Sequence, residues 1–372
     1  MSSTENQVYQ WAKVLHSRFP TLGYWQIVTL ALFSLGVVLA RSCQIMLVAE
    51  ELGFIGKADT VGKRLKRFLS NNRLEIDRIF PYWIEWVLSS YSGNEFDFLV
   101  DETKLGNRMG IMMVSLAYRQ RAIPLIWRCY KANDKDAYPE EGQVQMILDM
   151  LKQIKPYIPA GCRYRIQADQ GIGNSSTLMR QLDKAGWIYL FRVKETSMFT
   201  SLGGFRFRLR DIAEQGRQGN AQGWLFTRSY RLVRGTLHVI WAEGYDQCWF
   251  LFTNDPLLSG HVYARRFWQE EGFRDLKSGG WRWDDSFIRD PEHMQRLILV
   301  LALAYAWIAT LGTLSFRLPS LLRQQIVAAD ESRYSVFRQG VRIFKRLRYI
   351  APHAIYLGLF FVPTNGRHPL LC

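Results

Sequence analysis

The sequence has no pair of closely spaced cysteines. Its five cysteines are odd in number, lie far apart and form no CxxC motif. Neither a zinc ribbon nor a disulfide framework is therefore indicated, and this usage fits a reducing cytosol best. The chain also has no glycine-rich phosphate loop, internal repeat or low-complexity tract, which argues against a P-loop enzyme and a repeat protein.

No segment has the pattern of a signal peptide or a clear membrane span. The N-terminus, MSSTENQVYQ, is polar and lacks the charged and apolar regions of a signal peptide. The most apolar run, residues 296–312, is a little short for a membrane span and contains Tyr305 and Trp307. We expect a buried core helix there and no membrane partner.

Acidic residues are few beside basic ones. The 372 residues include 48 Lys or Arg and 33 Asp or Glu, giving a net charge of +15 and a pI near 9.7. This surplus indicates a polyanionic partner, either nucleic acid or an anionic membrane. The alternative is a basic enzyme that binds no polyanion. Hydrophobic residues make up 48% of the chain, so global disorder is not expected.

The N-terminal part has apolar residues at helical spacing, and we expect residues 1–92 to form a helical DNA-binding domain. Asp59 and Thr60 are candidate N-caps of a helix that carries a basic cluster. The cluster consists of Lys63, Arg64, Lys66 and Arg67. This helix either contacts DNA or presents a solvated charged face.

Beyond residue 92 the pattern changes to alternating strands and helices. Residues 93–195 are expected in the order β-β-β-α-β-α-β, with Ser175 or Ser176 capping the second helix. Residues 196–256 are expected to be consecutive strands, an all-β insertion. Residues 257–314 return to helices, and residues 315–372 form a basic C-terminal tail. The expected fold class is α/β, with a mixed sheet flanked by helices.

Two of the expected strands end in an aspartate, Asp101 in LVDET and Asp169 in IQADQG. Reactive groups gather at strand ends in open α/β sheets. If the two strands are neighbours, the carboxylates converge, and a third acid would complete a hard-oxygen site suited to Mg²⁺ or Mn²⁺. Each aspartate alone is equally compatible with a turn or cap. Other acids of the region are no less acidic: Asp97, Glu102 and Asp275.

The segment YARRFWQEEGFRDLK offers the third acid. On a single α-helix, one narrow stripe would hold four of its polar residues: Tyr263, Arg266, Glu270 and Lys277. Glu271 would point roughly 80° away from that stripe. Glu270 therefore lies on the stripe, and a stripe of this composition could hold a metal, or phosphates, or nothing at all.

The spacing of Tyr263, Arg266, Glu270 and Lys277 resembles the Y-R-E-K signature of DDE transposases of bacterial insertion sequences. The insertion-sequence-four family and its close relatives carry it. LVDET resembles the first-aspartate motif of these enzymes, and ADQGIGNSSTLMRQLDKAGWIYLFRVK resembles the second-aspartate region. CWFLFTNDP resembles the strand that closes the β insertion. The resemblance covers about residues 95–312.

The resemblance implies a ribonuclease-H-like catalytic core with a β insertion, and metal-dependent cleavage and joining of DNA strands. It implies that Asp101, Asp169 and Glu270 hold two Mg²⁺ or Mn²⁺ ions. The groups expected to hold the DNA end beside them are Tyr263, Arg266 and Lys277. Relatives pass through a hairpin end and act as dimers, so we expect a homodimer on double-stranded DNA, both element inverted repeats and target DNA. The expected location is the bacterial cytoplasm, in association with the nucleoid.

The resemblance also implies an aromatic platform for an unstacked base. Relatives use a tryptophan of the insertion there, and this chain offers three: Trp224, Trp241 and Trp249. The alternative is that all three are core residues. Two other functions remain open, a ribonuclease-H-like nuclease that cuts without joining and a domesticated DNA-binding protein with a dead site. The intact acid triad argues against the second.

Overall fold

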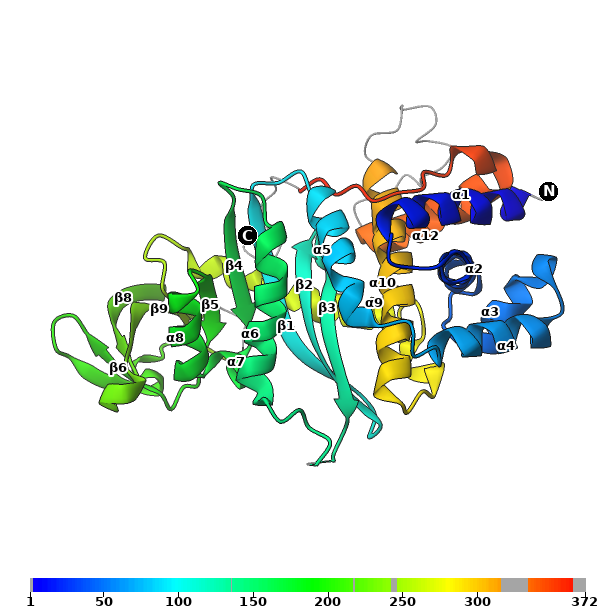
Figure 1. The fold of residues 1–372 in the computed structure, drawn as a ribbon. Coiled ribbons are helices and arrows are strands. Elements are labelled where there is room, and N and C mark those ends of the chain that lie inside the picture. The colour runs from blue at the N-terminus through cyan, green and yellow to red at the C-terminus, as the bar shows by residue number, and fades with distance from the viewer. Residues whose placement is uncertain (1–2, 135, 217, 242–245, 316–333, 364–372) are drawn as a thin grey trace.

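The computed structural model describes residues 3–134, 136–216, 218–241, 246–315 and 334–363. One sheet of ten strands runs through the middle of the molecule (Figure 1). The N-terminal helices gather at one end, and strands β6 to β9 lie at the other. Helices α6 and α8 lie in front of the sheet in this view, and α9 lies behind it.

The sheet is mixed, as predicted. Its strand order is β3-β2-β1-β4-β5-β10-β9-β8-β6-β7, in which β1, β4 and β5 run parallel and the other pairs run antiparallel. The first strands along the chain are β1 (Glu95–Leu105), β2 (Met109–Tyr118), β3 (Arg121–Lys131), β4 (Arg163–Ala168) and β5 (Ile188–Arg192). The later strands are β6 (Met198–Ser201), β7 (Arg206–Arg208), β8 (Gln218–Leu225), β9 (Val233–Ile240) and β10 (Trp249–Thr253).

The first three strands form an antiparallel meander whose centre is fully buried. All ten residues of β2 are buried, because helices cover both faces of the sheet there. The turn to β3 consists of Arg119 and Gln120, whose φ angles are 44° and 61°. Positive φ at both central residues is the geometry that joins two twisted strands by a two-residue hairpin.

Two crossover segments make β4 and β5 parallel to β1. The helices of these segments are α6 (Gly142–Ile154), α7 (Gln170–Gly173) and α8 (Ser176–Lys184). The hydroxyl of Ser175 accepts a hydrogen bond from the Leu178 N–H at 3.2 Å, so the predicted cap of α8 is confirmed. The predicted order of strands and helices is therefore correct, with the short α7 as an addition.

The strands of residues 196–256 prolong the same sheet. Strand β10 pairs with β5 on one side and with β9 on the other, and β8, β6 and β7 follow outward. The β segment is therefore joined through β5 to the strands β4 and β1, beside which the candidate aspartates lie.

The N-terminal helices are α1 (Ser3–Arg18), α2 (Tyr24–Ala40), α3 (Ile45–Glu51), α4 (Ala58–Leu69) and α5 (Phe80–Ser89). Helices α2 and α4 pack on one long apolar helix, α10 (Pro291–Leu314), while α3 packs on α2 and α4, and α5 packs on β3. Helix α10 is long and apolar enough to cross a membrane, but 94% of its most apolar window is buried inside the protein. It is a core helix, as predicted.

Part of the C-terminal segment also packs on α10. Helix α12 (Val336–Ile350) crosses it so closely that a Cβ on Gly340 would lie 1.8 Å from the Ile308 carbonyl oxygen. A Cβ on Gly312 would lie 1.9 Å from the Val336 carbonyl oxygen. Glycine is required at both positions for this approach. Of the predicted basic tail, residues 316–333 and 364–372 lie outside the described residues.

The prediction of the caps of α4 is wrong. The helix begins at Ala58 with Lys57 as its N-cap residue, so Asp59 and Thr60 lie inside its first turn. Asp59 still contributes there, because a negative charge near a helix N-terminus interacts favourably with the helix dipole.

Candidate active site

Strand pairing brings Asp101 and Asp169 together. Asp169 follows the end of β4 as predicted, but the prediction that Asp101 ends its strand is wrong, because β1 continues to Leu105 in its pairing with β2. Strands β1 and β4 are parallel neighbours, and Val100 pairs directly with Ala168. Asp101 and Asp169 are the next residues on each strand, so they lie side by side at the carboxyl edge of the pair. The two strands are therefore neighbours, which is the condition for the two carboxylates to converge.

Each aspartate is also held by backbone donors. Asp169 is the N-cap of α7, and its Oδ1 accepts hydrogen bonds from the N–H groups of Gly171 at 2.9 Å and Ile172 at 3.2 Å. Oδ1 of Asp101 accepts a bond from the Glu102 N–H at 2.9 Å. Asp169 is therefore a helix cap, and it is also a candidate site residue, since its Oδ2 takes no part in the cap.

The segment with the third acid is not one α-helix. It begins as the 3₁₀ helix η6 (Gly260–Arg266) and continues as α9 (Phe267–Leu276), so the single helix predicted is wrong. In a 3₁₀ helix residues three apart eclipse each other, so Tyr263 and Arg266 still share a face. Glu270, one α-helical turn later, shares it too. Lys277 lies beyond the last helical residue, with ψ at −131°.

Arg266 reaches all three candidate acids. Its Nη2 lies 3.5 Å from Oδ2 of Asp101 and 3.6 Å from Oδ2 of Asp169. Its Nη1 donates to Oε1 of Glu270. The three acids are thus arranged around one guanidinium, whose side chain is only 9% exposed. Asp101 is the most buried of the three acids, at 15% exposed against 36% for Asp169 and 55% for Glu270, and its charge most needs this counter-charge.

The electrostatics of the site reflect this crowding. The pKa of Asp101 is raised to about 6, because burial and the charges of Asp169 and Glu270 outweigh the opposing charge of Arg266. Burial lowers the pKa of Arg266, but the surrounding acids raise it above its usual value. The cluster therefore favours added positive charge.

Glu271 points away from the cluster. Its Oε2 lies 3.2 Å from Nη1 of Arg121 and also binds Arg274. Arg121 in turn binds Asp275, a buried acid that also accepts a hydrogen bond from Tyr305 at 3.2 Å. Glu271 and Asp275 therefore anchor α9 to strand β3, and only Glu270 turns toward the aspartates.

Residues 137–307 match the family described as transposase DDE domain. The chain therefore contains a transposase DDE domain. The predicted ribonuclease-H-like core with a helical N-terminal part is confirmed by this family and by the mixed sheet. Asp169 and Glu270 lie inside the matched range and Asp101 precedes it. The search of curated proteins found no match.

DDE transposases generally use divalent metal ions, and the donor chemistry of the cluster suits them. Three carboxylates are the hard oxygen ligands that Mg²⁺ and Mn²⁺ prefer. Within the described residues, no three Asp, Glu, His or Cys side chains are arranged to hold an ion. The guanidinium of Arg266 lies between the acids instead, so a cation already occupies the position that their charges favour.

The other two residues of the signature are engaged within the transposase. Tyr263 is 1% exposed and packs in an apolar cluster with Leu190, Leu251 and Leu258. Nζ of Lys277 donates to Oγ1 of Thr103 at 2.9 Å and to the Lys104 carbonyl at 3.0 Å. In this structure Lys277 ties the end of α9 to the strand that carries Asp101.

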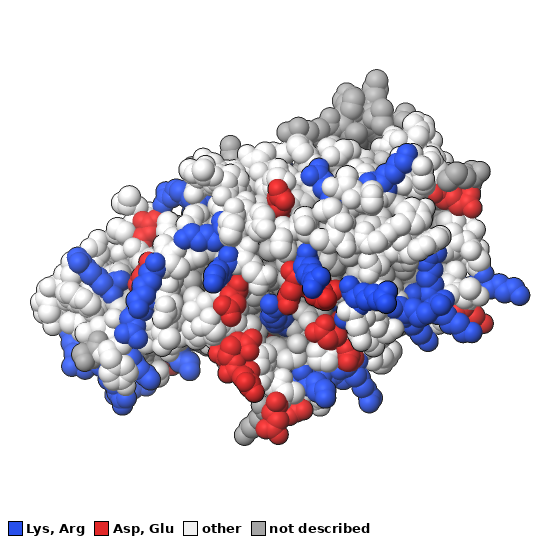
Figure 2. Space-filling view, in the orientation of Figure 1, with Lys and Arg blue, Asp and Glu red and all other residues white. Residues whose placement is uncertain are grey.

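The basic cluster lies on an exposed face of α4. Lys63, Lys66 and Arg67 are exposed, whereas Arg64 is half-buried and its Nε donates to Oγ1 of Thr29 at 3.0 Å. Figure 2 shows Lys and Arg side chains gathered over the end of the transposase formed by α2, α3 and α4. Arg64 thus joins α4 to α2, and the other three cations remain on the surface.

A cavity of about 650 Å³ begins next to Asp169, although none of the three candidate acids lines it. Its lining includes Gln170, which follows Asp169, together with the half-buried Trp241. Three cations that sequence reasoning missed also line it: Arg192, Lys194 and Arg210. Arg192 could have been found from the sequence, because it ends β5. Strand β5 is the parallel neighbour of β4, and Asp169 follows β4 at the same edge of the sheet. Trp249 packs instead between Tyr263 and Phe267.

Proposed function

We propose that this DDE transposase cuts the ends of its own mobile element and joins them to target DNA. The observation that carries the proposal is the convergence of Asp101, Asp169 and Glu270 on one buried guanidinium. Such a cluster of like charges on a rigid sheet edge is costly to fold and suits a catalytic site. We also infer that the enzyme belongs to the insertion-sequence-four group or a close relative, since it carries the Y-R-E-K spacing.

The reaction has two in-line steps at phosphorus. In the first, the oxygen of water bonds to phosphorus and the 3′ oxygen of the cut strand leaves as a hydroxyl. In the second, that hydroxyl attacks a phosphodiester of the target and displaces its 3′ oxygen. Two divalent ions, when bound, would activate the attacking oxygen and stabilise the leaving one. Asp101, Asp169 and Glu270 would hold them.

Arg266 has a distinct part in this proposal. Its guanidinium neutralises the three carboxylates in the free protein and is a planar donor that fits a phosphate. When DNA binds, the scissile phosphate brings negative charge to the same place. We propose that Arg266 then donates to the phosphate.

DNA would be held at two further places. The exposed cations of α4 suit the phosphates of the element end, and their contacts would be salt-dependent. The cavity beside Gln170 combines three cations with Trp241, which suits a nucleotide whose base has left the duplex. We propose Trp241 as the stacking platform, since Trp249 packs between Tyr263 and Phe267. A homodimer bound to two element ends completes the proposal.

The test uses the full chain and DNA from the two ends of the mobile element that encodes it. We expect Mg²⁺- or Mn²⁺-dependent nicks at the element ends and, with added target DNA, joined products. Cleavage without joining would identify the alternative, a ribonuclease-H-like nuclease. Binding without cleavage under both metals would identify a domesticated DNA-binding protein.

A further inference from the structure

A second buried aspartate lies on the same sheet face as the acid cluster. Asp97 precedes Asp101 by four residues on β1, and alternate residues of a strand share a face. Asp97 is 3% exposed, yet it takes no part in the cluster around Arg266. The two carboxylates are about 13 Å apart along the strand.

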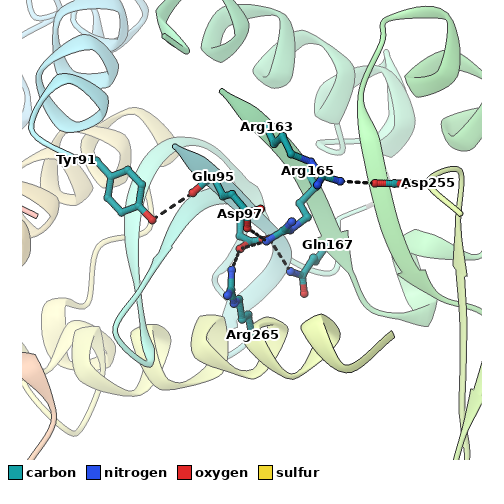
Figure 3. Close-up of polar contacts among 8 residues, drawn as sticks. All are labelled: Tyr91, Glu95, Asp97, Arg163, Arg165, Gln167, Asp255 and Arg265. Atoms are coloured by element: carbon teal, nitrogen blue, oxygen red, sulfur yellow. Dashed lines mark hydrogen bonds and ion pairs between the residues drawn. The ribbon is translucent and has the colours of Figure 1, made fainter. Parts of the chain in front are cut away.

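Asp97 is the centre of a polar network drawn from three segments (Figure 3). Its Oδ1 accepts hydrogen bonds from Nε of Arg165 and, at 3.0 Å, from Nε2 of Gln167, both on β4. Its Oδ2 accepts a bond from Nη2 of Arg165 at 3.1 Å and one from Nη1 of Arg265 on η6. Arg165 also donates to Glu95 at 2.9 Å.

Two guanidinium groups compensate the charge of the buried Asp97 carboxylate. Burial alone would raise the pKa of Asp97, but the guanidiniums of Arg165 and Arg265 hold it below the usual value. Breaking a buried pair is strongly destabilising because one charge is left without a partner. Asp97 therefore joins β1, β4 and η6 firmly at one point.

The position of Arg265 links this network to the candidate active site. Arg265 and Arg266 are consecutive residues of η6, and they reach different acids of β1. Arg265 binds Asp97, near the start of the strand, and Arg266 lies 3.5 Å from Asp101, toward its end. The end of η6 is thus held to β1 at two points, and α9 with Glu270 continues directly from it.

We propose that Asp97 and Arg265 are positioning residues that fix η6 and α9 so that Arg266 and Glu270 face the catalytic aspartates. The proposal rests on the proposed function for its consequence in catalysis, but not for the contact itself. We assign neither residue a contact with the reacting phosphate. Displacement of catalytic groups by about 1 Å can cost about 100-fold in rate.

The first measurement needs no DNA. Hydrogen exchange of residues 260–276 should become about fivefold faster or more in Arg265→Gln, because the segment loses one of its two anchors. Arg265→Lys keeps a charge and should restore most of the protection. The matched control is Arg163→Gln, which removes an exposed arginine of β4 that pairs with Asp255 at 2.7 Å (Figure 3). Unchanged exchange in Arg265→Gln would overturn the proposal.

The second measurement is the single-turnover cleavage rate at saturating DNA. Arg265→Gln should lower it about tenfold or more and change the DNA Kd by less than about threefold. Asp97→Asn also weakens the bonds to Arg165 and Gln167, so it should slow cleavage at least as much. The double variant should be no slower than Asp97→Asn, since both changes remove the contact between Asp97 and Arg265. A raised Kd with an unchanged rate would make Arg265 a DNA contact and overturn positioning. If the wild type cuts no DNA, the proposed function fails, and the exchange result alone decides the proposal.

Discussion

Asp101 and Asp169 occupy equivalent positions on neighbouring parallel strands, each one residue beyond a directly paired residue. This register, more than the acidity of either residue, selects them from the many acids of the core. Asp97 is buried and paired with two arginines, and Asp275 is buried and paired with Arg121, each in a separate network. Asp101 and Asp169 instead share their counter-charge, Arg266, with Glu270.

The first prediction concerns these two aspartates. Asp101→Ala and Asp169→Asn should abolish cleavage and leave binding of end DNA nearly unchanged, because most DNA affinity comes from phosphate contacts by cations. Asparagine is chosen at Asp169 because its amide oxygen can still cap α7, a contact that contributes about 1 kcal/mol. Nicking and gel-shift assays in Mg²⁺ measure the two properties. Near-normal nicking by either variant would refute the assignment.

The second prediction separates two adjacent glutamates. Glu270→Gln keeps the shape of the side chain but removes the charge that Mg²⁺ requires, so cleavage should be lost while folding and DNA binding persist. Glu271→Gln should keep most of the activity, because Glu271 contacts Arg121 and Arg274 at the edge of α9. The reverse result, measured in the same nicking assay, would remove Glu270 from the site.

The sequence allowed much of this site to be predicted, because the features concerned are local. Alternating hydrophobic runs, the Ser175 cap and the place of Asp169 after β4 all follow from short-range patterns. The continuation of β1 beyond Asp101 does not. The break between η6 and α9 does not, since both helix types bring residues three apart onto one face. Nor does the place of β10 between β5 and β9, because pairing partners distant in sequence are chosen by the whole sheet.

The position of Arg266 illustrates the same limit. Its spacing from Glu270 predicts their contact, which occurs one helical turn apart. Its contact with Asp101 and Asp169 depends on how η6 crosses the sheet, and that depends on Asp97 and Arg265. No local pattern encodes this crossing.

The third prediction is that a variant of Asp101 gains folding stability although it loses activity. The pKa of Asp101 is raised to about 6 in the folded protein, so above pH 6 its charge destabilises the fold, and the cost disappears as the pH falls toward 4. Asp101→Asn should therefore raise the free energy of unfolding by about 1–3 kcal/mol at pH 7.5 without divalent ions. The gain should vanish near pH 4. Denaturant unfolding at both pH values measures it, and a gain independent of pH would exclude titration of Asp101 as its cause.

The fourth prediction concerns recognition by α4. Removing residues 1–92 would strip α2 and α4 from α10, so surface substitutions are the better test. The variant replaces three exposed cations by glutamine: Lys63, Lys66 and Arg67. It should bind end DNA more weakly and show a shallower salt dependence of binding, since about one counterion is released for each phosphate contact.

The control for that prediction changes the same charge on another helix. It replaces three exposed cations of α12 by glutamine: Arg342, Lys345 and Arg346. Binding measured at fixed salt should distinguish end DNA from random DNA in the control as in the wild type. Equal losses in both variants would assign the effect to net charge and not to α4.

The last prediction concerns the tryptophan that lines the cavity. Trp241 lines the cavity that includes Gln170, whereas Trp249 packs between Tyr263 and Phe267 and its loss would disturb folding. Stacking on an aromatic ring contributes about 1–3 kcal/mol per base. Trp241→Ala should therefore slow the step that needs an unstacked base, cleavage of the second strand, and leave first-strand nicking close to normal. Trp241→Phe keeps a ring and should restore most of the rate. If Trp241→Ala slowed both steps equally, or only lowered the melting temperature, Trp241 would be a core residue and the cavity would need another role.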